Sequence, residues 1–200
     1  MTVKDILITS ATLLNRTDLK NFINGQGVNE YKQVEQDFNL LLDAFNLVEE
    51  EIATDYYRLN ESETFTVVNG VIKCEDFSKN PLAILSVKNL NGNAVNAQIK
   101  PDGIYTNESQ VVVEYTYIPT YKTVEQNSSF TGSLITKRAL ALGAVTEFSL
   151  IKGDYEEAVM WHSKYMSALN TCITRKKVKK VKERKWLWLP IKTLQAFQIT

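Results

Sequence analysis

The sequence predicts an α+β fold: a bundle of about four helices, a small inserted antiparallel β module, and an extended basic C-terminal arm. Apolar residues recur every three or four positions before residue 57 and after residue 133, which is typical of helices. Between residues 61 and 120 they form short runs separated by Asn-Gly pairs, which is typical of strands and turns. Lys and Arg cluster after residue 174. We therefore expect a domain over residues 1–170 and an arm over residues 171–200.

The first two helices are predicted over residues 3–22 and 29–57. Thr2 offers an N-cap hydroxyl and Asp5 a carboxylate three residues later, a pairing that favours a helix start. Residues 24–27 predict a loop between the helices. The second helix carries acidic residues over much of its surface, and its apolar stripe consists of Val34, Phe38, Leu41, Leu42, Phe45, Val48, Ile52 and Tyr56.

The β module is predicted over residues 61–120, with five or six short strands. The pair Asn69-Gly70 lies between two apolar runs, and both residue types accept the positive φ that a tight hairpin turn requires. We therefore expect residues 64–68 and 71–74 to form a hairpin. Further strands are expected at residues 82–90, 97–100, 103–106 and 111–118.

A second pair of helices is predicted over residues 133–152 and 154–173. Gly153 suits the residue after a helix, and Asp154 suits the N-cap of the next one. The helix over 133–152 is apolar or small on nearly all sides. Such a helix must be covered on most faces, either by its own domain or by other copies of the chain.

The net charge of zero hides a strong asymmetry along the chain. Residues 171–200 carry nine basic residues and one acidic residue, whereas the first 170 residues carry 14 basic and 22 acidic residues. A basic end of this kind indicates an acidic partner, which could be nucleic acid or the acidic body of a neighbouring copy.

The basic run over residues 175–185 has three interpretations: a solvated helix extension, a docking arm for another protein copy, or non-specific contact with nucleic acid. Two tryptophans follow the run directly and favour docking, because such side chains are poor surface residues unless something covers them. The predicted partner-binding residues are Arg175, Lys176, Lys177, Lys179, Lys180, Lys182, Arg184, Lys185, Trp186 and Trp188.

The acidic cluster Glu49, Glu50, Glu51 and Asp55 is a second candidate site. Consecutive residues on a helix diverge by about 100°, so these carboxylates do not converge on one ion or one reacting atom. We interpret the cluster as a solvated helix surface, or as one that faces the lumen of an assembly.

Catalysis is not predicted for this chain. His162 is the only histidine, no hydrolase triad spacing occurs, and the glycines form no nucleotide-binding pattern. Cys74 and Cys172 are expected to be reduced thiols, and we expect neither a cofactor nor a metal. The sequence predicts no transmembrane helix and no signal peptide, so we expect a protein made and kept in a cytoplasm-like compartment.

Taken together, these parts resemble the head-to-tail adaptor (connector) proteins of short-tailed and related bacteriophages. The resemblance covers most of the chain: the N-terminal helices ending in Tyr56-Tyr57-Arg58-Leu59, the β module opened by residues 65–70, and residues 77–92. Its most telling element is the helical pair over residues 141–161, and a basic arm with Arg184-Lys185-Trp186 completes it.

The resemblance implies a structural virion protein that forms a dodecameric ring below the portal, joins head to tail and continues the DNA channel. The implied partners are the portal protein, a tail or second neck ring protein, and genomic DNA through non-specific contact in the channel. The implied location is the virion neck, after synthesis in the bacterial host cytoplasm. An acidic face at Glu49, Glu50, Glu51 and Asp55 would then line the channel and repel phosphates. The alternative is a nucleic-acid-binding protein that uses the basic arm.

Overall fold

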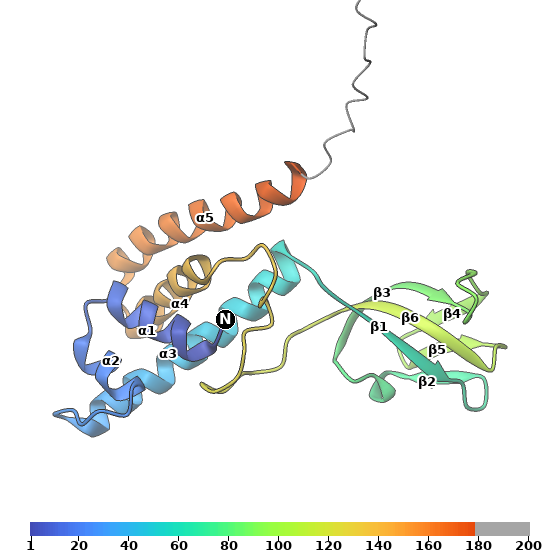
Figure 1. The fold of residues 1–200 in the computed structure, drawn as a ribbon, viewed down its shortest axis with the longest axis horizontal. Coiled ribbons are helices and arrows are strands. Elements are labelled where there is room, and N and C mark those ends of the chain that lie inside the picture. The colour runs from blue at the N-terminus through green and yellow to red at the C-terminus, as the bar shows by residue number, and fades with distance from the viewer. Residues whose placement is uncertain (179–200) are drawn as a thin grey trace, which may run out of the picture.

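The computed structural model describes residues 1–178, with side chains described through Thr174. The described chain has two parts, a helical body and a β module that projects from one end of the body (Figure 1). The chain enters the module just after the third helix and returns to the body through a long segment over residues 118–136. The α+β class is confirmed by five α-helices and two antiparallel sheets within the described residues.

The first predicted helix, over residues 3–22, is wrong as a single element. It is two helices, α1 (Val3–Leu13) and α2 (Thr17–Ile23), and the predicted cap is present because the Asp5 N–H donates to Thr2 Oγ1 at 3.1 Å. The chain breaks between them at Asn15, whose φ is 55°. The break brings the next residue, Arg16, into ion pairs with Asp18 and Asp37. A tertiary ion pair thus overrides the local helical pattern.

The second predicted helix, over residues 29–57, corresponds to α3 (Tyr31–Glu51) followed by a π-helical turn (Ile52–Tyr56). The Tyr57 N–H closes this wider turn on the carbonyl of Ile52 at 2.7 Å. A π-helical turn adds one residue to the helical repeat and redirects the chain. It leads the chain directly from the body into the first strand.

The third and fourth predicted helices are α4 (Lys137–Lys152) and α5 (Tyr155–Val178). α4 starts at Lys137, not at residue 133, because the Thr136 hydroxyl caps it by accepting from the Ala139 N–H at 3.2 Å. Gly153, with a φ of 83°, ends α4 as predicted. α5 continues to Val178, so the first eight residues of the predicted arm, 171–178, are helical in the backbone.

α4 is the central helix of the body and packs against α1, α3 and α5. Its close approach to two of them depends on Gly143, where an added Cβ would lie 2.6 Å from Val48 of α3 and 3.0 Å from the Tyr165 ring of α5. Of the two ways to cover this apolar helix that the sequence left open, its own domain covers it. Ten of its residues are buried within the single chain.

The β module consists of two three-stranded antiparallel sheets. One has the order β1 (Leu59–Thr66), β6 (Gln110–Tyr117) and β3 (Pro81–Lys88). The other has the order β2 (Val71–Lys73), β5 (Gly103–Thr106) and β4 (Ala97–Lys100). A short 3₁₀ turn, Cys74–Asp76, follows β2.

The predicted hairpin over residues 64–74 is wrong beyond its turn. Asn69 and Gly70 do form a tight turn, with φ values of 54° and 76°, and the Val71 N–H donates to the carbonyl of Val68 at 3.1 Å. The flanking strands, however, do not pair with each other. β1 pairs with β6 and β2 pairs with β5, so the turn passes the chain from one sheet to the other.

The body and the module have separate hydrophobic cores. The body core joins α1 to α5 and includes Phe45, Leu140 and Tyr165, whereas the module core lies between the two sheets. The module core consists of Phe65, Ile72, Val87, Ile104, Val111, Val113 and Tyr115. Tyr117, at the end of β6, packs against both cores. The module is therefore a distinct packing unit joined to the body at a narrow junction.

Candidate interaction surfaces

The predicted acidic surface near the C-terminal end of α3 does not include Glu49, which is buried. Glu49 is 1% exposed, and its Oε1 accepts hydrogen bonds from the Ser128 hydroxyl and, at 2.9 Å, from the Ser129 N–H. Burial raises the pKa of Glu49, and the hydrogen bonds from Ser128 and Ser129 only partly offset this effect. Glu49 therefore anchors the return segment inside the body and lines no surface.

The other three predicted carboxylates have different surroundings. Glu51 is half-buried and accepts a hydrogen bond from the Tyr165 hydroxyl of α5 at 3.1 Å. Burial raises the pKa of Glu51, and the nearby charges of Glu147 and Asp55 act in the same direction. Glu50 is half-buried and Asp55 is exposed. The four residues thus do not form one continuous acidic face.

Asn46 anchors the same return segment one helical turn before Glu49. Its side-chain oxygen accepts from the Lys122 N–H at 2.6 Å, and its amide group donates to the Lys122 carbonyl at 3.2 Å. Residues 124 and 126 also accept hydrogen bonds from the first backbone N–H groups of α1. The polar segment over residues 118–136, predicted as a plain loop, is therefore fastened to α3 and to the N-terminus.

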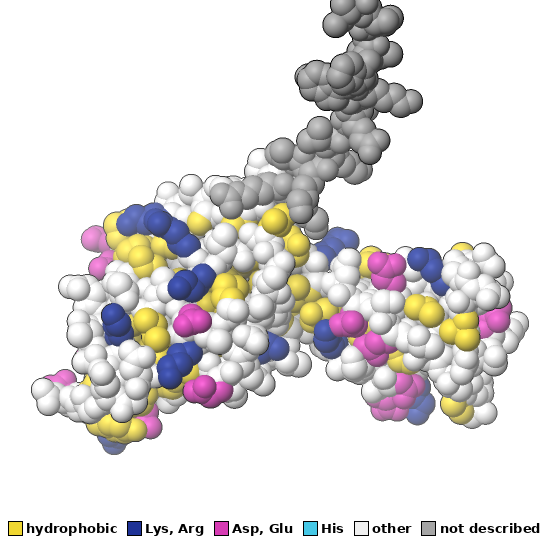
Figure 2. Space-filling view, in the orientation of Figure 1, with side chains coloured by type: hydrophobic (Ala, Val, Ile, Leu, Met, Phe, Trp, Pro, Cys, Tyr) yellow, Lys and Arg dark blue, Asp and Glu magenta, His cyan; other side chains and the backbone are white. Residues whose placement is uncertain are grey.

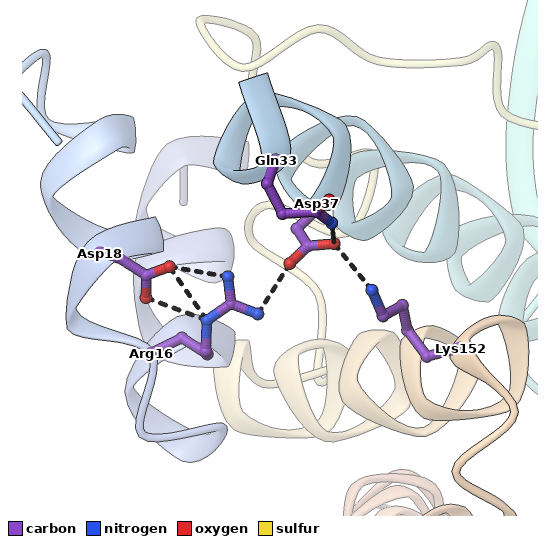
Figure 3. Close-up of polar contacts among 5 residues, drawn as sticks. All are labelled: Arg16, Asp18, Gln33, Asp37 and Lys152. Atoms are coloured by element: carbon purple, nitrogen blue, oxygen red, sulfur yellow. Dashed lines mark hydrogen bonds and ion pairs between the residues drawn. The ribbon is translucent and has the colours of Figure 1, made fainter. Parts of the chain in front are cut away.

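A buried charge network, missed by the sequence analysis, lies at the other end of α3 (Figure 3). Asp37 is 2% exposed and forms ion pairs with Arg16 at 2.8 Å and with Lys152 at 3.0 Å. Gln33 donates a further hydrogen bond to it at 3.3 Å. Burial raises the pKa of Asp37, but the bonds from Lys152 and Arg16 outweigh burial and hold it below its ordinary value. The network joins three separate helices and is structural.

The described residues show no arrangement that resembles a catalytic or metal centre. His162 is exposed on α5, and no group of three or more His, Cys, Asp or Glu in residues 1–178 could hold a metal ion. Cys74 is an exposed thiol and Cys172 a buried one. No helix within residues 1–178 has both the length and the hydropathy needed to cross a membrane.

From residue 175 onward, the predicted arm lies outside the residues whose side chains the structure describes. This holds for every predicted partner-binding residue: Arg175, Lys176, Lys177, Lys179, Lys180, Lys182, Arg184, Lys185, Trp186 and Trp188. The surfaces that the structure does describe are therefore those of the body and the module. Figure 2 shows hydrophobic side chains at the surface of both parts, interspersed with charges of both signs.

The first apolar surface lies around the turn between α4 and α5. Four large apolar side chains within ten residues are more than 40% exposed, and we name them the hairpin patch: Leu150, Ile151, Tyr155 and Val159. They belong to the same helix pair whose inner residues, such as Leu140 and Leu169, are completely buried. The helix pair α4 and α5 therefore has an apolar face that is buried in the body core and, in addition, the exposed apolar side chains of the hairpin patch.

The second apolar surface is a groove between the two sheets of the module. It has a volume of about 180 Å³ and lies between β3 of one sheet and β4 of the other. We name it the inter-sheet groove and define it by Cys74, Phe77, Leu82, Ile84, Ile99 and Ile104. Leu82 and Ile99 at its rim are exposed. No local pattern predicts it, because β3 and β4 follow each other along the chain but belong to different sheets.

Comparison with models of known protein families finds no family that matches this chain, and no curated protein matches its sequence.

Proposed function

We propose that this chain is a structural ring protein of a bacteriophage neck, which joins the head to the tail below the portal and continues the DNA channel. The observation that carries the proposal is the hairpin patch, because α4 is already fully covered on its inner side and the same helix pair still exposes large apolar side chains. Several large apolar side chains exposed near one turn of such an element favour protein association there. The partner that requires no additional protein is a second copy of the chain.

Head-to-tail contacts between copies close into a ring when the rotation between them allows it. In such a ring the hairpin patch of one copy contacts a different surface of the next copy. The helical bodies would form the ring wall, since the body has the larger core. A dodecamer, as the resemblance implies, would match the portal above, and a tail protein or second neck ring protein would bind below.

Because Glu49 is buried, the proposed channel-lining role applies only to acidic residues of this group that reach the surface. Asp55 is exposed and Glu50 is half-buried, and both lie near the C-terminal end of α3. In the ring, these two carboxylates would face the lumen and repel the phosphates of passing DNA. Contact with genomic DNA would then be non-specific and weak, as passage through a channel requires.

The experiment is to mix the purified full chain with the portal protein encoded in the same genome and to image the product by electron microscopy. We expect closed rings on the portal. Val159→Glu, which places a charge in the hairpin patch, should abolish them. The matched control is Val68→Glu, a substitution of a similarly exposed valine in the β module, 64% exposed against 72% for Val159. Rings that form normally with Val159→Glu would contradict the role of the patch, and their absence with the wild-type chain would contradict the function.

A second candidate, a nucleic-acid-binding protein, is favoured by one observation: eight of the eleven residues 175–185 are Lys or Arg. Such a segment binds DNA through counterion release, so affinity would fall steeply as salt rises. Retention of the isolated chain on DNA at low salt, lost at about 200 mM salt, would support this candidate. No retention at low salt would exclude it.

A further inference from the structure

Two strands at the rim of the inter-sheet groove have an unpaired edge within the described residues. β4 pairs there only with β5. β3 pairs with β6 and, at its C-terminal end, with residues 94–95, so the part of its outer edge that stays open lies toward residues 81–86. An exposed edge strand presents unpaired N–H and C=O groups, and natural proteins usually protect it with charge, bulges or a covering segment. Here most of the residues that line the groove between the edges are apolar, and Lys100 is the one charged residue among them. Such a surface at a sheet edge is suited to a covering segment.

β3 has two bulges, and each has a leucine as its extra residue. Pro81 and Ala83 pair with consecutive residues of β6, so Leu82 is left over, and the same irregularity between Ile84 and Ser86 leaves Leu85 over. Both leucines are more than 40% exposed. Bulges re-aim side chains and often occur beside functional sites. These two place apolar side chains along the edge that borders the groove.

The size of the groove favours a protein side chain over a small-molecule ligand. Ligand pockets usually measure about 300–1,000 Å³, and the volume here is about 180 Å³. That volume suits one large apolar side chain presented by a strand. A strand added to a sheet edge binds through its backbone, and alternate side chains enter pockets beside the edge.

The chain itself contains a segment of the required chemistry, Trp186-Leu187-Trp188-Leu189. In an extended conformation both tryptophans lie on one face and both leucines on the other. Either face offers a large apolar side chain to a groove. Pro190 follows directly and would end backbone pairing, because proline has no N–H.

Charge complementarity supports the same occupant. Residues 175–200 carry nine basic residues and one acidic residue, and residues 1–174 carry 14 basic and 22 acidic residues. Glu75 and Asp76 follow the groove residue Cys74 directly and are exposed. Glu75 forms an ion pair with Lys73 at 3.0 Å, so in the proposed complex Arg184 and Lys185, which precede the tryptophans, would share these carboxylates with Lys73. The segment over residues 179–185 spans at most about 25 Å, so it can carry the tryptophans away from α5 toward a neighbour.

We propose that the inter-sheet groove of one copy binds residues 186–189 of a second copy as an added strand along β3. The choice of a second copy rests on the proposed ring, in which every groove is filled by the preceding subunit. The binding surface itself rests on the bulged edge and the groove.

The test uses the native thiol of Cys74, which lies in the groove and is exposed. In the full chain with Cys172→Ser, a single new cysteine is introduced by Leu187→Cys or by Trp188→Cys. Diamide then oxidises paired thiols to a disulfide and is itself reduced to the hydrazine. Disulfides form only where the two Cα atoms lie within about 7 Å. The reaction is run on the chain alone and on the chain mixed with portal protein.

We expect covalent dimers and, in the ring, higher multimers, because every chain carries both cysteines. They should form at least tenfold faster from one of the two introduced positions than from the other, because neighbouring strand residues face opposite sides. Ile99→Glu in the groove should slow the cross-link at least tenfold. Leu90→Glu is the matched control, since Leu90 is 60% exposed and Ile99 59% exposed, but Leu90 lies outside the groove. Leu82→Glu serves as a second groove variant. Hydrogen exchange is measured on each variant to check that its module is folded.

Three outcomes would overturn the inference: no cross-link, a disulfide within a single chain, or a cross-link that neither groove variant slows. Microscopy of the same samples separates this inference from the proposed function. Rings on the portal without the cross-link would overturn the groove and leave the neck function standing. Cross-linked dimers without rings would overturn the neck function and leave the groove standing.

Discussion

The helical body and the β module differ most in the size of their cores. The body buries a cluster of 25 apolar residues, whereas the module, over about 60 residues, buries a cluster of seven. A small two-sheet module with so few buried side chains is only marginally stable. The contrast shows that the body holds most of the buried apolar side chains, whereas the module depends on a much smaller core.

The two parts also differ in how they use polar side chains. In the body, α3 buries Asp37, Asn46 and Glu49. Asp37 pairs with Arg16 and Lys152, whereas Asn46 and Glu49 both fasten the return segment over residues 118–136. In the module, charged side chains such as Lys73 and Glu75 form their ion pairs at the surface. Buried polar contacts specify one arrangement because losing a partner is costly, whereas surface pairs contribute little. The body is therefore the more rigidly specified part.

The largest expected effect tests whether the two cores unfold separately. Phe45→Ala removes a fully buried ring from the body core, and it should lower the free energy of unfolding of the body by about 3–5 kcal/mol. The module should be unaffected because its core is separate. Hydrogen exchange with mass spectrometry, measured across a denaturant series, reports the two regions independently.

The counterpart of this variant is Val113→Ala, a change in the module core. It should destabilise peptides within residues 59–117 and leave the helical peptides unchanged. If either variant accelerates exchange equally in both regions, the molecule unfolds as one unit and the comparison is wrong.

The next effect, about 3 kcal/mol, is expected from Asp37→Ala, because the substitution leaves Arg16 and Lys152 without their shared carboxylate. Asp43→Ala, at an exposed position of the same helix, is the control. Since the pKa of Asp37 is lowered on folding, its contribution is present above the unfolded pKa of about 3.9 and is lost as pH falls through the folded value. Denaturation at pH 7 and pH 3 measures the free energy of unfolding of the body in the variant and in the wild type. A difference between the two proteins that is the same at both pH values would refute the role of Asp37.

Glu49 should show the opposite pH dependence and a smaller effect. Glu49→Ala removes the acceptor of two hydrogen bonds and should cost about 2 kcal/mol. Because burial raises the folded pKa of Glu49, its favourable contribution is complete below the unfolded pKa and declines as pH rises through the folded pKa. Glu49→Gln should therefore gain stability relative to wild type as pH rises from 4 to 8. Glu50→Gln is the neighbouring control, and a gain of the same size there would contradict the assignment.

Local signals in the sequence predicted most of the fold. The Thr2 cap, the Gly153 helix end and the strand over residues 103–106 all depend on neighbouring residues, and the structure confirms them. The split after Leu13 and the partner of β1 depend on contacts far along the chain. Such contacts arise from tertiary ion pairs and from sheet order, which no local pattern contains.

The candidate surfaces were less predictable than the fold. Three adjacent acids on α3, Glu49 to Glu51, look alike in the sequence, yet Glu49 is buried because residues 128 and 129 cross it from about 80 positions away. The exposure of Leu82 and Leu85 results from bulges in pairing with β6, which alternation alone does not reveal. A burial prediction from periodicity fails wherever a long segment returns over a helix.

The smallest expected effect concerns the junction between the two parts. The Lys79 ammonium forms an ion pair with Glu61 and lies 4.2 Å from the centroid of the Tyr117 ring, and Tyr117 packs against both cores. Lys79→Met keeps the apolar stem and removes the charge. It should cost about 1 kcal/mol or less, because both contacts are partly solvated.

The location of this small loss decides how independent the two parts are. If the junction only supports the module, exchange rises in β1, β3 and β6 and the helices are unchanged. If Tyr117 transmits the loss, exchange also rises in the residues that follow α3, beginning with the π-helical turn over Ile52–Tyr56. Lys88→Met, which removes an exposed charge from the same sheet, sets the baseline. Because the body holds its own core and its own polar anchors, we expect the effect to stop at the junction.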